Sequence, residues 1–174
     1  MQDKNNKSAI DLLIGLSING HKGLVIARGN PAQIKRVIPE TKNVIIALLT
    51  RETHKGYSTI SDLENLEKTI KIFSTKNKHS VILMDGIHYL LTRFSFKEFI
   101  ERLYSINDIV LHNKSILFIR IDPSTVDSNQ LAVFENELQR LPSQKTEDII
   151  IEDDLYDIVR YIYEENQINA IVSF

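Results

Sequence analysis

The sequence predicts a three-layer α/β sandwich, in which a mostly parallel sheet of four to five strands carries helices on both faces. Two observations predict this fold. The strand-like segments are continuous apolar runs rather than alternating ones, which is typical of strands buried on both faces. They are separated by segments with helical periodicity, which indicates right-handed crossovers between parallel strands. We expect this α/β domain over residues 8–151, with an amphipathic C-terminal helix and a short extended tail over residues 152–174.

The first half of the chain alternates between helix and strand in short steps. Asn19-Gly20 ends the first helical segment, and Asn30-Pro31 starts the second because Asn is a good N-cap and Pro suits the first helical position. The expected elements are a helix over Ala9–Ser17, a strand over Gly23–Arg28, a helix from Asn30 to Ile38, a strand over Val44–Thr50 and a polar loop over Arg51–Thr59.

The second half continues the alternation with longer helices. Ser61 with Glu64, and Ser95 with Glu98, have the spacing of capping boxes, and Pro142 ends the last helix. The expected elements are a helix after Ser61, a strand over Val81–Met84, a helix after Ser95, a second short helix near Asn107, a strand over Ser115–Ile121, a helix from Asp127 or Ser128 and an edge strand over Ile149–Ile151.

Composition excludes several classes of protein. The 174 residues are 43% hydrophobic and 25% charged, as in ordinary globular domains, and no apolar run is long enough to span a membrane. The absence of cysteine excludes disulfides and thiolate metal sites. The net charge of −2 combines a mildly basic body with an acidic segment from Glu147 onward, which does not indicate a general nucleic-acid binder. With no secretory pattern at the amino terminus, we expect a cytoplasmic protein.

Polar side chains follow the predicted strands at their carboxyl ends, where parallel sheets bind ligands. They make up the candidate ligand-binding set: Arg28, Asn30, Thr50, Arg51, Asp85 and Asp122. Arginines and aspartates facing one crevice could hold a phosphate or a metal–phosphate pair. The alternative is structural, with Asp85 capping the turn into the next helix and the arginines pairing with neighbouring carboxylates.

Val81–Met84 followed by Asp85 has the form of a strand that presents the magnesium-side carboxylate of an ATPase, yet no GxxxxGK[ST] phosphate loop occurs in the sequence. The five histidines are scattered without a zinc spacing, and no GxSxG motif is present. We therefore assign no catalytic residue, no metal ligand and no cofactor.

Four segments together resemble the archaeal domain of unknown function 835. They are GLVIARGNPAQIKR, VIIALLTRE, SVILMDGIHYLL and SILFIRIDP, and the resemblance covers roughly residues 8–142. Its most specific element is the D-G-x-x-Y-L motif at Asp85, Gly86, Tyr89 and Leu90. The resemblance implies a degenerate relative of RecA- and KaiC-type ATPase domains that lacks the phosphate loop. It also implies a regulatory or scaffolding role and names no reaction.

The C-terminal segment carries a separate pattern. Asp153–Glu165 is expected to form an amphipathic helix whose apolar face offers a homodimer surface: Leu155, Ile158, Val159, Ile162 and Tyr163. The helix and the following Ala170–Phe174 resemble the opening of a winged-helix domain. Either the natural protein continues into such a domain, or this segment packs on the body or on a second copy. A complete helix-turn-helix does not fit here, so we expect no sequence-specific DNA binding by this chain alone.

Three functions remain open from the sequence. The first is a non-catalytic regulatory or protein-interaction module. The second is a sensor that binds a nucleotide or a phosphorylated ligand through Arg28, Arg51 and Asp85. The third is a hydrolase or nuclease that uses Asp85 and Asp122 around a metal ion.

Overall fold

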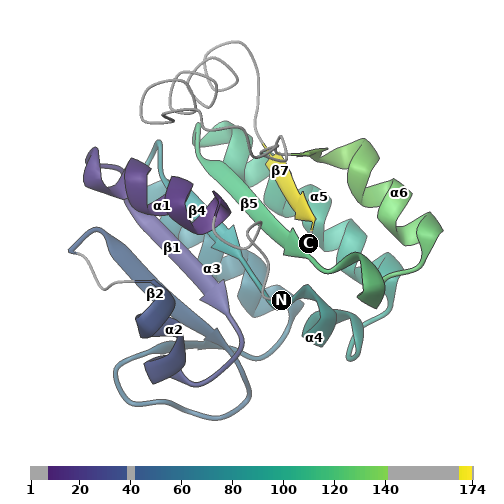
Figure 1. Ribbon diagram of the computed structural model, residues 1–174, viewed down its shortest axis with the longest axis horizontal. Helices are drawn as coiled ribbons and strands as arrows, with labels where there is room; N and C mark the ends of the chain where they lie inside the picture. The colour runs from purple at the N-terminus through teal and green to yellow at the C-terminus, as the bar shows by residue number, and fades with distance from the viewer. Residues whose placement is uncertain (1–7, 39–41, 141–168, 174) are drawn as a thin grey trace, which may run out of the picture.

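A parallel sheet forms the middle layer of the molecule (Figure 1). The computed structural model describes residues 8–38, 42–140 and 169–173. Within these ranges the sheet has seven strands in the order β3-β2-β1-β4-β5-β7-β6, and every pairing is parallel. The strands are β1 (Gly23–Ala27), β2 (Val44–Leu49), β3 (Ser58–Ile60), β4 (Val81–Met84), β5 (Ile116–Ile121), β6 (Gln139–Arg140) and β7 (Asn169–Ser173).

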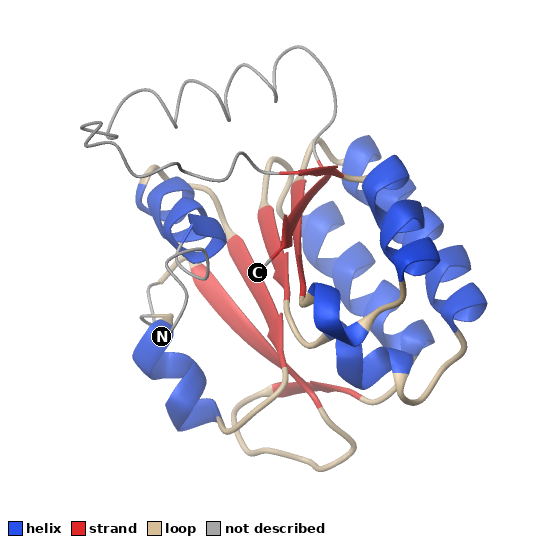
Figure 2. Ribbon diagram, turned by 45° about the vertical axis from the view of Figure 1, so that its right-hand side comes forward, coloured by secondary structure: helices blue, strands red, loops and turns tan. Residues whose placement is uncertain are grey.

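Helices cover both faces of this sheet, as Figure 2 shows. One face carries α1 (Ser8–Ile18) and α2 (Pro31–Val37) over a buried cluster that includes Leu13, Val25 and Phe118. The other face carries the remaining helices: α3 (Leu63–Lys76), α4 (Ile87–Leu91), α5 (Phe96–His112) and α6 (Ser128–Glu137). The three-layer α/β fold predicted from the sequence is therefore confirmed, and four of its strands are the predicted apolar runs.

The local predictions differ from the structure at four places. The last helix, expected to run to Pro142, ends at Glu137, and Gln139–Arg140 form β6. The loop expected over residues 51–59 contains the start of β3, a three-residue strand that pairs with the end of β2. The helix α3 is capped by Asp62 rather than Ser61, because the Asp62 carboxylate accepts a hydrogen bond from the Asn65 backbone N–H. One continuous helix, α5, replaces the two expected between Ser95 and Asn113. The capping box of Ser95 and Glu98 is confirmed.

The C-terminal strand β7 lies inside the sheet, between β5 and β6. It pairs with β5 along its whole length and with both residues of β6. The expected domain boundary at residues 151–152, the edge strand over 149–151 and the amphipathic helix over 153–165 all lie outside the described residues. In the described part of the chain, no helix has the length and apolarity to cross a membrane.

Candidate functional site

The strand order places a topological switch point at the centre of the sheet. The chain runs outward from β1 to β2 and β3, and then returns to the opposite side of β1 to form β4. The carboxyl ends of β1 and β4 therefore flank the topological switch point, where open α/β sheets bind ligands. Arg28 follows β1 and Asp85 follows β4, so two of the predicted site residues lie at this point.

The side chains of Arg28 and Asp85 point to opposite faces of the sheet. Successive residues of a strand alternate between its faces. Arg28 continues the alternation of Leu24 and Ile26, which face α3–α6, whereas Asp85 continues that of Val81 and Leu83, which face α1. The contacts agree with this alternation, because each side chain has a partner on its own face. The switch point therefore does not bring the arginine and the carboxylate together.

Asp85 forms an ion pair with Arg120. The guanidinium of Arg120 donates to the Asp85 carboxylate at 2.9 Å, and the two side chains are 15% and 34% exposed. Arg120 reaches this position because it lies on β5, the neighbour of β4, on the same face as Phe118. Water and salt screen an ion pair this shielded less than a surface pair, so removing one partner costs more. The negative charge of Asp85, the carboxylate compared above with a magnesium ligand, is thus balanced by Arg120 of the same protein.

Arg28 stacks on an aromatic ring instead of pairing with a carboxylate. Its guanidinium carbon lies 3.8 Å from the centroid of the Tyr89 ring, on α4. Arg93 approaches the same ring at 5.3 Å and donates to the Tyr89 hydroxyl at 2.8 Å and to the Ser61 carbonyl at 2.7 Å. These contacts join the ends of β1, β3 and α4. We call Arg28, Tyr89 and Arg93 the arginine–tyrosine stack.

Gly86 allows the stack to form. Its φ of +94° is in the left-handed region that favours glycine, and it turns the chain from β4 into α4. A Cβ at this position would lie 3.2 Å from both the Arg28 Cβ and the Leu49 Cδ1. The Asp85 backbone N–H also donates to the Ile26 carbonyl at 2.8 Å. The D-G-x-x-Y motif is therefore explained by structure: an ion pair, a tight turn and a ring that supports Arg28.

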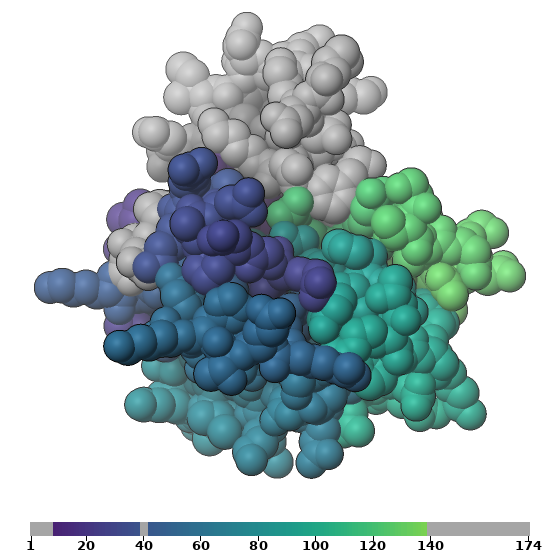
Figure 3. Space-filling view, turned by 90° about the horizontal axis from the view of Figure 1, so that it is seen from below, coloured from purple at the N-terminus to yellow at the C-terminus, as the bar shows by residue number. Residues whose placement is uncertain are grey.

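The other predicted site residues serve local structure. Asn30 caps α2 by accepting from the Ala32 N–H at 2.9 Å, and the Thr50 hydroxyl accepts from the Glu52 N–H at 3.1 Å. Asp122 caps the short helix η2 (Pro123–Thr125) by accepting from Ser124, whose hydroxyl and backbone N–H hold the pKa of the Asp122 carboxyl below its usual value. Arg51 is exposed. In Figure 3, the indigo and blue surface belongs to the segments that follow β1 and β2. This surface lies next to teal surface formed by residues from later in the chain.

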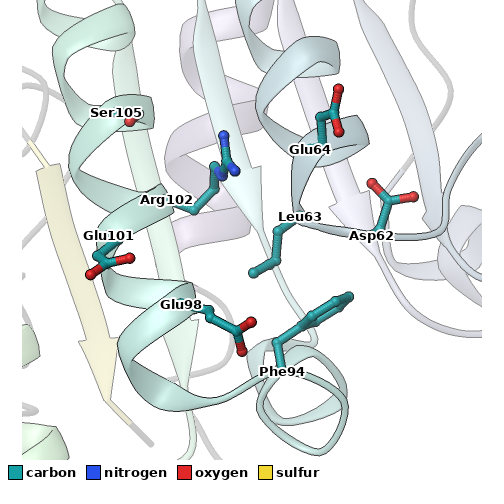
Figure 4. A pocket seen from close by; sticks show the side chains of 8 residues that line it. All are labelled: Asp62, Leu63, Glu64, Phe94, Glu98, Glu101, Arg102 and Ser105. Atoms are coloured by element: carbon teal, nitrogen blue, oxygen red, sulfur yellow. The ribbon is translucent and has the colours of Figure 1, made fainter.

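A separate acidic hollow opens between the first turns of α3 and α5. It has a volume of about 500 Å³, and Leu63 and Phe94 line it together with four carboxylates (Figure 4). Two of these carboxylates are helix caps: the Asn65 backbone N–H lowers the pKa of Asp62, and the Ser95 hydroxyl lowers the pKa of Glu98. The Arg102 guanidinium donates to Glu67, which raises the pKa of Arg102. The hollow thus joins two helix starts, where Asp62 and Glu98 serve as caps and Glu101 pairs with Lys97.

A match to a family model shows which protein family the chain belongs to. The model described as "Protein of unknown function (DUF835)" matches residues 2–138. The chain belongs to the DUF835 family. A comparison with curated proteins gives no match. The DUF835 match covers α1 to α6 and ends just before β6.

Sequence reasoning missed Arg120 and Arg93, the two partners that organise the DUF835 switch point. Arg120 had a signal, because it is the one charged residue in the otherwise apolar strand ILFIRI. A charge in a buried strand requires a counter-charge, and Asp85 at the end of a neighbouring strand was the candidate. Arg93 had no comparable signal, since its acceptors come from a loop and a helix that only the tertiary fold brings together.

Proposed function

We propose that this DUF835 protein is a non-catalytic regulatory or protein-interaction module of archaeal signalling or transcriptional regulation, acting in the cytoplasm. Its scaffold would be a relative of RecA- and KaiC-type ATPase domains that lacks the phosphate loop. The observation that supports this most is the Asp85–Arg120 ion pair, because it commits the carboxylate that an ATPase would offer to magnesium.

The segment after β1 supports the same proposal. In a nucleotide-binding domain this segment cradles phosphate with a glycine-rich loop and the first turn of a long helix. Here it is Arg28-Gly29-Asn30, followed by a helix of 7 residues whose first free N–H group is capped by Asn30. A triphosphate would therefore find little of the backbone cradle that it needs.

A second candidate function is a sensor for a nucleotide or another phosphorylated ligand, and one observation favours it. Over the described residues, the guanidinium of Arg28 has a single hydrogen bond, a 3.5 Å contact to the Leu49 carbonyl. A guanidinium carries five N–H donors, so most of those on Arg28 remain available to an anion. The stacking on Tyr89 would hold the group in place for such a ligand.

Thermal unfolding in the presence of ATP or GTP with magnesium separates the two candidates. A ligand at ten times its dissociation constant stabilises a protein by about 1.4 kcal/mol, which for a chain of this size raises the melting temperature by about 3–6 °C. We expect no saturable rise for the wild-type protein. A saturable rise in melting temperature that is absent in Arg28→Ala but present in the matched control Arg36→Ala would favour the sensor function over the interaction module.

We also propose that the C-terminal segment, whose pattern resembles the opening of a winged-helix domain, contributes to self-association. The apolar positions Ile158 and Ile162 on the expected helix support this role. Ile158→Asp combined with Ile162→Asp should then lower the mass of the protein measured by light scattering, whereas the neighbouring Asp157→Asn should not. An unchanged mass in the double variant would remove this surface from the proposal.

A further inference from the structure

The strand β7 covers a sheet edge that the matched family domain leaves open. The DUF835 match ends at Leu138, before β6 and well before β7. Within the matched region β5 pairs with β4 on one side only, and its other side pairs with β7. Without β7, the backbone groups of Leu117–Ile121 on that side would lack their strand partner. β7 thus completes the sheet from outside the family domain.

β5 has the character of a central strand rather than an edge strand. Its side chains from Ile116 to Ile119 are at most 4% exposed, and its sequence is apolar apart from Arg120. Edge strands of soluble proteins are usually short, charged or irregular, since an exposed regular edge pairs with other chains. An apolar edge five residues long is the kind of surface to which extended segments add as an extra strand.

β7 is attached to the body mainly through this one edge. It pairs with five residues of β5, in a register from Leu117↔Asn169 to Ile121↔Ser173, but with only two residues of β6. Residues 141–168 separate it in sequence from β6. The five strands from β3 to β5 pair with one another independently of β7, so β7 can leave β5 without disturbing their order.

We propose that the outer edge of β5 is the strand-docking site of this module, and that it exchanges β7 with a second copy of the chain. Residues 169–173 pair with this edge within one chain, so a second copy carries a strand of the same fit. Reciprocal exchange preserves every β5–β7 pairing, so the exchanged dimer and the monomer differ chiefly in the entropy of association. The inference rests on the interaction role proposed above and locates its surface.

The balance between the two forms follows from effective concentration. A tethered strand competes with a free one as if it were present at a concentration on the order of millimolar. The exchanged dimer should therefore be a minor species in dilute solution and become substantial as the protein approaches that range. Covalent trapping can detect the exchanged dimer both when it is a minor species and when it is substantial.

Disulfide trapping between two single-cysteine variants tests the exchange, because the chain has no cysteine of its own. Ile121→Cys and Ser173→Cys place thiols on register partners. Neighbouring strands lie about 4.8 Å apart, within the Cα separation of about 4.4–6.8 Å that a disulfide allows. The two full-length variants, one carrying a mass tag, are mixed at high concentration and oxidised slowly. Leu117→Cys mixed with Ser173→Cys is the control, since these positions are about 13 Å apart along the strands.

The expected result is a covalent heterodimer of the register pair, in roughly tenfold excess over the control pair. Each single variant oxidised alone corrects for random surface disulfides, and thermal unfolding shows that each variant is folded. The chain carrying both Ile121→Cys and Ser173→Cys completes the test. If it closes an internal disulfide while the mixture gives no heterodimer, β7 stays on its own body and the exchange is refuted. If neither disulfide forms, β7 does not dock on β5 and the site is refuted. Saturable nucleotide binding would overturn the proposed function without changing this disulfide pattern.

Discussion

Replacing Asp85 by alanine should destabilise the protein because it removes the carboxylate that pairs with Arg120. The Arg120 side chain is 15% exposed and its guanidinium lies 2.9 Å from the Asp85 carboxylate. A hydrogen bond between charged groups contributes about 1.5–3 kcal/mol, while breaking a fully buried pair costs about 3–5 kcal/mol. Because Asp85 is 34% exposed, water relieves part of this cost. We expect a loss of about 2 kcal/mol for Asp85→Ala.

The assay is equilibrium unfolding in urea, supported by thermal unfolding. A loss of about 2 kcal/mol corresponds to a fall of about 4–8 °C in melting temperature for a chain of this size. Asp85→Asn keeps the shape and one acceptor oxygen, so it should lose about half as much as Asp85→Ala. Arg120→Met removes the other partner and keeps most of its apolar stem.

A double-mutant cycle isolates the pair from the remaining contacts of each residue. We expect Asp85→Ala and Arg120→Met to couple by about 1–2 kcal/mol, since the two side chains contact each other directly. A coupling energy within about 0.3 kcal/mol of zero would show that the pair behaves as an exposed surface pair. That result would refute the view that Asp85 is held by the protein itself.

The other predictions concern the stack, the turn and the helix caps. Tyr89→Leu should lower the free energy of unfolding by about 1–2 kcal/mol, because it removes the ring under Arg28. Tyr89→Phe should lower it by less than half as much, because it removes only the hydroxyl that accepts from Arg93. Equal losses for the two variants in urea unfolding would contradict the stacking. Gly86→Ala should cost about 1–3 kcal/mol, because its φ is +94° and the new Cβ meets Arg28 and Leu49. Gly15→Ala, inside α1 with nothing within 4 Å, should instead stabilise by about 0.5–1 kcal/mol; a loss at Gly15 as large as that at Gly86 would contradict this account. The pKa of the Glu98 carboxyl is lowered by the Ser95 hydroxyl, so its contribution to stability is present above the usual value of 4.5 and is lost as the pH falls through the lower folded pKa. The stability difference between the wild type and Glu98→Gln should therefore shrink on acidification, and a difference independent of pH from neutral to strongly acid solution would refute the capping role.

The layered fold could be predicted because its signals are local. Val44–Leu49 and Val81–Met84 are continuous apolar runs, and no other element type explains them as well at their length. Helix starts were predictable for the same reason, since Ser95 and Glu98 satisfy each other within one turn. The start of α3 shows the limit of this reasoning, because Ser61 and Asp62 are both good caps and only the observed hydrogen bond to Asn65 selects Asp62.

The short strands and the pairing of side chains depended on tertiary structure. β3 has one buried residue, Ile60, and exists because it can pair with the end of β2. An extended tail was expected at the C-terminus, but the place of β7 between β5 and β6 depends on pairings that only the tertiary fold brings together. The site residues were predictable as positions at the strand ends. Their roles were not, because the alternation of side chains sends Arg28 and Asp85 to opposite faces, where Tyr89 and Arg120 meet them.

We infer that contacts within the protein occupy the switch point at which an ATPase would bind its nucleotide. Amide NMR spectra during titration with millimolar ATP and magnesium test it most directly, because the N–H groups of Gly29 and Gly86 flank this point. Neither signal should shift in a saturable way, and Gly56 in the loop before β3 serves as an internal reference. Saturable shifts of Gly29 and Gly86 but not of Gly56, lost in Arg28→Ala, would contradict it.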